Sequence, residues 1–210
     1  GEGRGAFLVS LRPALKEMER YAAWLSDQHG MHLKGPIVVT IQTRGKAAKL
    51  GHYARDRWAD NKDDSPISEI VISAEHLRDH ALEILGTVHH EMIHAFAHHN
   101  GTKDTSKSGR HNKAFKELAE DSGLVVEMGT KSKGWAHTRM TEEWAKFVED
   151  AFRIDEAAFA IARTVVPPKE AKPSKTVAWI CECPQSVRVA AGWELRAVCP
   201  VCGKEFGRKE

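Results

Sequence analysis

The chain has 210 residues, of which 41% are hydrophobic and 29% are charged. That length allows one core and a small second module, and no apolar run reaches the roughly 20 residues of a membrane span. The net charge of +2 neither proves nor excludes a nucleic-acid partner, because positive charge can gather on one surface. We expect a soluble, cytoplasmic monomer that begins with a flexible leader over residues 1–5.

The first half of the chain predicts a helix followed by three strands. Residues 13–28 carry apolar side chains at helical spacing, between an opening proline and a closing glycine. Residues 36–42, 50–58 and 66–73 are short and rich in β-branched or aromatic residues, with a turn-forming segment between the last two. We expect these strands to form a small, mainly antiparallel sheet.

A second helix, residues 81–99, contains the pattern His90-Glu91-Met92-Ile93-His94. One helical turn separates the two histidines, so both imidazoles can reach one ion. Glu91 lies about 100° around the helix from His90, where its carboxylate can take a proton from a water molecule beside the metal. His-Glu-x-x-His is typical of zinc hydrolases, but so short a pattern also arises by chance.

A third ligand would strengthen the interpretation, and His111 is the strongest candidate. Residues 108–123 predict a further helix, on which His111 and Phe115 share the apolar face. A histidine on such a face is usually a core residue, but one that follows the metal motif closely has a reason to be buried. Glu117 and Glu120 are alternative ligands, although we expect both to face solvent.

The order of these motifs resembles the SprT-like zinc metalloprotease family, whose eukaryotic members include the Spartan DNA–protein crosslink proteases. The resemblance rests on His90-Glu91-x-x-His94, on His111-Asn112-x-x-Phe115, and on the preceding segments Gly51-His52-Tyr53 and Ile70-Val71-Ile72-Ser73. The family usually has glycine where this chain has Asn112.

The resemblance implies an α+β, zincin-like domain in which the sheet packs on the motif helix and offers one edge to an extended substrate. Zinc would be held by His90, His94 and His111, with Glu91 as general base. The implied activity is endopeptidase cleavage of proteins bound or crosslinked to DNA. The residue that stabilises the oxyanion stays open, and the candidates are Tyr53, His98 and His137.

The alternative function is a nucleic-acid-binding regulator that uses a zincin-like scaffold with little or no peptidase activity. The intact Glu91 argues against it, because such a scaffold has no chemical need for that carboxylate.

Lysine and arginine recur on both sides of the predicted third ligand. They are Lys103, Lys107, Arg110, Lys113, Lys116, Lys131, Lys133 and Arg139. They could form a phosphate-contacting rim, and an ordinary solvated face accounts for them equally well. Thr141 then caps a predicted long helix over residues 142–162.

The C-terminal part predicts a linker and a separate metal-binding module. Residues 165–175 hold three prolines among charges, so we divide the chain into a protease domain (1–163), a linker (164–176) and a zinc ribbon (177–210). The ribbon rests on two cysteine pairs: Cys181 with Cys183, and Cys199 with Cys202. Two disulfides would require an oxidising compartment, for which nothing in the sequence argues. We therefore expect two zinc ions, one catalytic and one structural.

Aromatic and basic residues of this module suit single-stranded nucleic acid. Trp179 and Trp193 offer stacking surfaces, and Arg188 and Arg196 offer positive charge. The alternative is that both tryptophans fill a small core.

Overall fold

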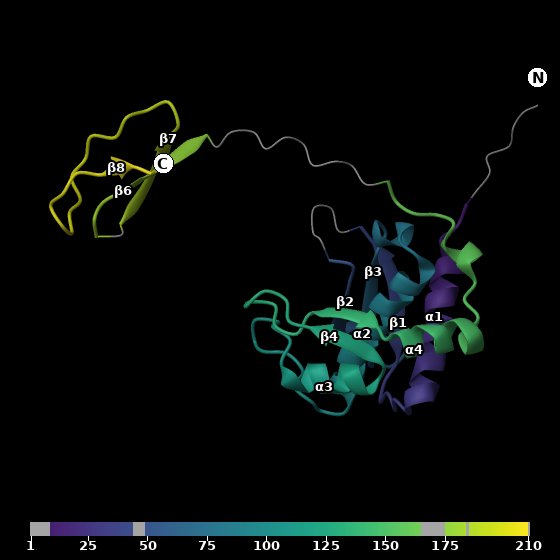
Figure 1. Ribbon diagram of the computed structural model, residues 1–210. Coiled ribbons are helices and arrows are strands. Elements are labelled where there is room, and N and C mark those ends of the chain that lie inside the picture. Colours follow the sequence, from purple (N-terminus) through teal and green to yellow (C-terminus); the bar gives the residue numbers. More distant parts are fainter. Residues whose placement is uncertain (1–8, 44–48, 165–174, 184, 210) are drawn as a thin grey trace, which may run out of the picture. The chain divides into compact units, whose positions relative to one another are not determined.

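The computed structural model describes residues 9–43, 49–164, 175–183 and 185–209. The chain separates into two compact units, Gly1–Val165 and Val166–Glu210, which are described in turn (Figure 1). The first unit mixes helices with strands, which confirms the predicted α+β class. The predicted leader and residues 165–174 of the predicted linker lie outside the described residues. Among the described helices, none combines the length and the apolarity that crossing a membrane requires.

Helix α1 (Arg12–His29) begins and ends within one residue of the predicted bounds, 13 and 28. Pro13 occupies the first turn, where its missing N–H costs no helical hydrogen bond. Gly30 ends the helix in the left-handed region, with φ of 57°. Between them, Met18, Tyr21 and Leu25 are completely buried in the main core.

The three predicted strands form one sheet in the order β1-β3-β2: β1 is Ile37–Gln42, β2 is Gly51–Ala59 and β3 is Pro66–Ser73. Strand β2 is antiparallel to β3, whereas β1 is parallel to it. The expectation of a mainly antiparallel sheet is therefore wrong for one of its two pairings. The reason is the position of β3, whose run Ile70-Val71-Ile72 is fully buried and belongs in the centre, between the other two strands.

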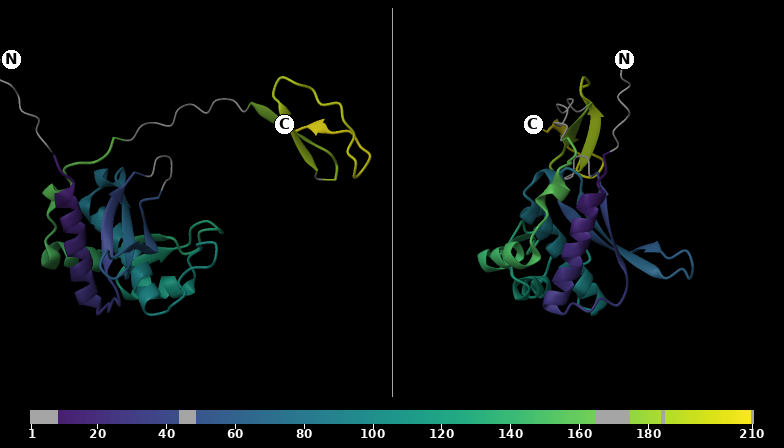
Figure 2. Two further views of the ribbon diagram at one scale, coloured as in Figure 1. Left: turned by 180° about the vertical axis from the view of Figure 1, so that it is seen from behind. Right: turned by 90° about the vertical axis from the view of Figure 1, so that its right-hand side faces the viewer.

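The β2–β3 hairpin is irregular beyond its first residues. The register shifts between Ala54 and Trp58, and Asp56 within this bulge has φ of 49°. Figure 2 shows the hairpin extending past the helices of its unit. The part of β2 nearest the motif helix is thus its beginning, at Gly51.

Helix α2 (Ala81–His99) contains the predicted metal motif and packs against both α1 and strands β2 and β3 of the sheet (Figure 1). Ile84, Leu85, Val88, Met92 and Ile93 point into the core and are at most 2% exposed. Gly51 approaches the helix so closely that an added Cβ would lie 2.8 Å from Cγ2 of Thr87. The start of β2 therefore runs directly along the motif helix.

Helix α3 (Lys113–Asp121) is shorter than predicted, and His111 precedes it instead of lying on its apolar face. Asn112 caps the helix, because its Oδ1 accepts the backbone N–H of Phe115 at 3.1 Å. After α3, strands β4 (Leu124–Glu127) and β5 (His137–Met140) form an antiparallel pair. The predicted placement of His111 within a helix is therefore wrong, because the cap lies one residue after it.

The long helix predicted over residues 142–162 is also wrong, although its cap is correct, since Thr141 Oγ1 accepts the N–H of Trp144. The chain forms three short pieces: α4 (Glu142–Phe147), a π-helical turn η2 (Val148–Phe152) and a 3₁₀ turn η3 (Glu156–Phe159). The helix stops at Arg153, which has φ of 56°.

The break at Arg153 is held by α1, a partner distant in sequence. The guanidinium of Arg20 donates to the backbone oxygens of Phe152 and Arg153, each at 3.0 Å. The carboxylate of Glu17 accepts the backbone N–H of Asp155 at 2.9 Å. These hydrogen bonds from α1 replace hydrogen bonds that a continuous helix would make. The spacing of apolar residues in the sequence does not predict them.

The second unit is a three-stranded antiparallel sheet in the order β7-β6-β8: β6 is Thr176–Ile180, β7 is Ser186–Ala190 and β8 is Gly207–Arg208. Its small core contains Cys181, Cys199 and Phe206, each at most 8% exposed. Trp179 packs against these residues. So little apolar area requires a further source of folding free energy.

Candidate metal centres

His90, His94 and His111 meet at one point of the first unit. The Nε2 atom of His111 lies 3.2 Å from Nε2 of His90 and 3.0 Å from Nε2 of His94. Nitrogens that share a tetrahedral zinc ion at a bond length of about 2.0–2.1 Å are roughly 3.3 Å apart. The three side chains therefore fit one zinc ion.

The outer nitrogen of each ring has its own partner. Nδ1 of His90 lies 2.8 Å from Oγ1 of Thr138, and Nδ1 of His94 contacts the carboxylate of Asp104. Nδ1 of His111 donates to the backbone oxygen of Lys133 at 3.2 Å. A carbonyl or carboxylate partner keeps the proton on Nδ1, which leaves the Nε2 lone pair for a metal.

The protonation state of the histidines agrees with this arrangement. Burial lowers the pKa of His90 well below its usual value, and nearby His94 acts in the same direction. Burial is also the main cause that lowers the pKa of His111, to about 4. Both shifts favour the neutral imidazole, which is the form that binds a metal.

Asp104 is expected to contribute to metal affinity without touching the metal. Asp104→Asn should weaken zinc binding by roughly 10- to 100-fold, because an amide orients and polarises His94 less well than a carboxylate. Titration against a chromogenic chelator measures this. Asp121→Asn, at the exposed end of α3, is the matched control. Equal zinc affinity in both variants would show that Asp104 has no such role.

Two further residues support the three histidines from outside the motif helix. Phe115 on α3 is fully buried and packs against all three rings, with centroid distances of 4.5–4.8 Å. Gly134 lies beside the backbone of His111, whose N–H donates to the oxygen of Lys133 at 3.0 Å. The third histidine is thus positioned by a loop that follows it by more than 20 residues.

Glu91 is only 5% exposed on the same helix as two of the histidines. Glu117 and Glu120, the alternative ligands, form ion pairs with Lys113 and Lys116 on α3 instead. Neither of the two alternative carboxylates on α3 therefore competes with the histidines for the metal.

The three oxyanion candidates differ in their surroundings. The hydroxyl of Tyr53 lies 2.8 Å from Nδ1 of His98 and 2.9 Å from Oγ of Ser68, and burial raises its pKa. His137 is exposed, with its ring close to Gly129. Tyr53 and His98 thus form a pair that joins β2 to the helical turn after His94.

The four cysteines of the second unit also converge. Their sulfur atoms all lie within 4.8 Å of one another, with Sγ of Cys183 at 3.2 Å from Cys181 and 3.5 Å from Cys199. All four are free thiols. A tetrahedral four-sulfur set is typical of structural zinc, and bound metal would supply the folding free energy that the small core lacks.

We expect two zinc ions per chain by elemental analysis, one for each set of ligands. A chain that ends at Ser174 should retain one ion, and Cys199→Ser in the full chain should also leave one. A single ion in the unmodified full chain would contradict the assignment of one of the two sites.

The predicted nucleic-acid residues of the second unit divide into two groups. Trp179 belongs to the small core, so for this residue the core alternative holds. Trp193 is 74% exposed, and Arg188 and Arg196 are also exposed. Of the four predicted residues, Trp193, Arg188 and Arg196 are accessible to a nucleic acid.

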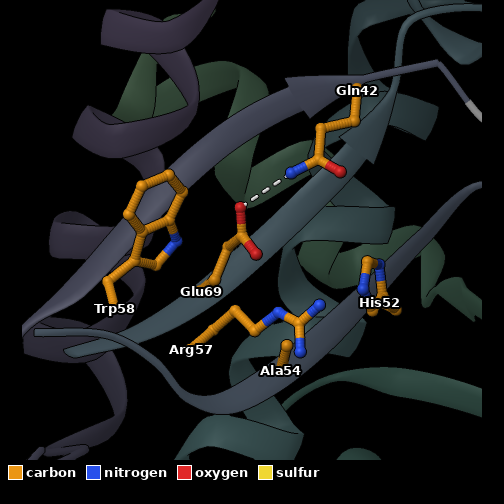
Figure 3. A pocket seen from close by; sticks show the side chains of 6 residues that line it. All are labelled: Gln42, His52, Ala54, Arg57, Trp58 and Glu69. Carbon is orange, nitrogen blue, oxygen red and sulfur yellow. Dashed lines mark hydrogen bonds between the residues drawn. The ribbon is translucent and has the colours of Figure 1, made fainter. Parts of the chain in front are cut away.

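A polar hollow of about 470 Å³ lies on the sheet, away from the histidines. Figure 3 shows Glu69 in this hollow, between Trp58 and Arg57. Glu69 is 3% exposed and accepts hydrogen bonds from Gln42 at 2.9 Å and Thr40 at 2.7 Å. Of the lining residues, His52 belongs to the segment that carries the family resemblance, and none was predicted as a site residue.

Comparison with protein families gives one match: the model of the SprT-like family aligns with residues 18–133, more than half of the chain. The aligned segment contains Glu91 and all three histidines, whereas β5 and the four cysteines lie outside it. Comparison with curated proteins and with solved structures finds no significant match.

Proposed function

The chain belongs to the SprT-like family, and from that premise we propose that it is a zinc-dependent endopeptidase of zincin-like fold that cleaves proteins bound or crosslinked to DNA. The observation that carries the proposal is the convergence of three Nε2 atoms on one point, next to a buried glutamate on the same helix. The family match supports the metalloprotease class, and the DNA-directed role is the finer part of the proposal.

The residues of the site have separate roles in this mechanism. His90, His94 and His111 would hold zinc, which when bound supplies Lewis acidity that polarises the scissile carbonyl and acidifies a water molecule. Glu91 would accept the proton of the attacking water and then donate it to the leaving amine. Asp104 and Thr138 would keep His94 and His90 in their binding orientation.

Strand β2 is the edge that we assign to the substrate. It is the last strand of the sheet order, and its beginning lies against Thr87 of the motif helix. A chain that adds to β2 would be held mainly by backbone hydrogen bonds, which select extended conformation over sequence. The hydroxyl of Tyr53 on β2 lies 2.8 Å from Nδ1 of His98, one turn after His94, and both groups are candidates to stabilise the oxyanion.

We assign selectivity to recruitment by nucleic acid, since strand addition alone accepts almost any extended chain. The second unit would be a zinc ribbon in which Trp193 stacks on bases while Arg188 and Arg196 contact phosphates. Binding on the same polymer raises the effective concentration of attached protein without requiring a new contact at the active site.

The test of the peptidase class uses an unfolded protein such as reduced, alkylated casein. The zinc-loaded chain is expected to cleave it, a chelator to stop cleavage, and added zinc to restore it. If no condition with zinc and single-stranded DNA gives cleavage, the regulator with a zincin-like scaffold becomes the better interpretation.

A further inference from the structure

Two loops meet at the third histidine. Loop A is residues 100–110 and loop B is residues 128–136, and they join the elements around the metal centre. The guanidinium Nε of Arg110 donates to the backbone oxygen of Lys131 at 3.0 Å, and the N–H of His111 donates to that of Lys133 at 3.0 Å. The two loops therefore form one hydrogen-bonded surface next to the histidines.

This surface is positively charged, although the whole chain is nearly neutral. Its cations are Lys103, Lys107, Arg110, Lys131 and Lys133. Asp104 is the single acidic residue of these two segments, and its side chain is 14% exposed and engaged with His94. Within the described residues, none of the five cations takes part in an ion pair. Their charge is thus available to a partner.

The tips of the two loops resemble each other. Loop A has Ser106-Lys107-Ser108, with the two hydroxyl oxygens 2.9 Å apart. Loop B has Thr130-Lys131-Ser132, with the two hydroxyl oxygens 3.0 Å apart. Each tip presents an exposed lysine between two exposed hydroxyl side chains. Lysine and hydroxyl groups together are the usual contacts to phosphate oxygens, which carry no sequence information.

We propose that loops A and B bind the phosphodiester backbone of nucleic acid, as a contact surface of the protease unit itself. The proposal rests on the proposed function and extends it, because loop B also holds the backbone and ring of His111. Phosphate binding at Lys107 and Lys131 would favour the joined arrangement of the loops. Nucleic acid would then stabilise the metal centre from which cleavage proceeds.

The first experiment measures binding of a fluorescent single-stranded oligonucleotide by the full, zinc-loaded chain at several salt concentrations. The variant Lys107→Ala/Lys131→Ala should bind roughly 25-fold more weakly at 0.1 M salt, since each phosphate contact contributes about 0.7 to the log–log salt slope. The slope itself should become shallower by about 1.4. Lys16→Ala/Lys146→Ala is the control, with two exposed lysines removed from helices α1 and α4 and an unchanged slope expected.

The second experiment measures how fast a chelator removes zinc from the histidine site. The oligonucleotide should slow removal from the unmodified chain and from the control, but not from the loop variant. Equal zinc content before the chelator is added shows that both variants are folded. A duplex of the same length distinguishes single strands from double strands as the source of the phosphates.

The outcomes separate this inference from the proposed function. Identical salt slopes for both variants would overturn the inference, because the second unit would then account for all binding. No binding by the unmodified chain at low salt would overturn both the inference and the DNA-directed role. Normal loop-dependent binding without any peptidase activity would overturn the proposed function alone. Polyglutamate is a polyanion without phosphate. If it displaced the fluorescent oligonucleotide as well as an unlabelled oligonucleotide does, the loops would bind polyanions in general, and the assignment to phosphodiesters would be rejected.

Discussion

Gly134→Ala is expected to empty the histidine site while the cysteine site keeps its metal. A Cβ at Gly134 would lie 2.1 Å from the backbone oxygen of His111, which is far inside van der Waals contact. The residue also has φ of 71°, which costs an alanine about 1–2 kcal/mol. The clash must move the third ligand away from the other two. Zinc affinity should fall by more than the roughly 10- to 100-fold typical of losing an outer partner.

Gly109→Ala is the matched control for this prediction. Gly109 has φ of 76°, but no atom lies within 4 Å of the position its Cβ would take. The two variants carry the same backbone strain and differ in the clash. Elemental analysis should give one zinc for Gly134→Ala and two for Gly109→Ala. Two ions in both variants would show that the loop does not position His111.

Glu91→Gln is expected to lose peptidase activity and keep both metal ions. The amide has nearly the same size as the carboxylate but cannot accept the proton of the attacking water. General-base groups typically contribute about 10²- to 10⁴-fold to the rate, so kcat/KM should fall within that range. Initial rates on an unfolded protein substrate measure it.

Glu83→Gln provides the comparison, because it makes the same chemical change at an exposed position two turns earlier on α2. Its rate should equal that of the unmodified chain. A Glu91→Gln variant that retains activity within a few fold would remove this residue from the mechanism and leave the proton transfer to another group.

Helical periodicity was sufficient to select the part of the site that lies within one element. His90 and His94 come together because of their spacing on α2, a property that sequence alone determines. His111 was selected for the apolar spacing that it shares with Phe115. The structure brings it to the other two histidines from a loop before the helix, which begins after its cap, Asn112.

The supporting residues could not be selected in this way. Asp104, Thr138 and Gly134 lie in loops or on a short strand, and they reach the histidines through contacts that span 10 to 48 residues. Such contacts leave no periodic signal. Weaker signals in the sequence point to two of them. Asp104 is an acidic residue only ten positions after His94, and Gly134 is a glycine in a lysine-rich turn.

The wrong predictions about the fold also come from contacts between residues that are distant in sequence. The parallel pairing of β1 with β3 depends on which strand takes the centre of the sheet, which strand propensities do not specify. The break in the helical run at Arg153, after η2, depends on Glu17 and Arg20 of α1. In both cases tertiary contacts overrule a local preference.

The proposed function is cleavage, at this metal centre, of proteins attached to DNA. The most direct test links one protein covalently to a single-stranded oligonucleotide and compares its cleavage by the zinc-loaded chain with that of the same protein unattached. We predict faster cleavage of the attached protein, none with a chelator, and none with Glu91→Gln. Failure to cleave the attached protein, with both zinc ions present, would contradict the account.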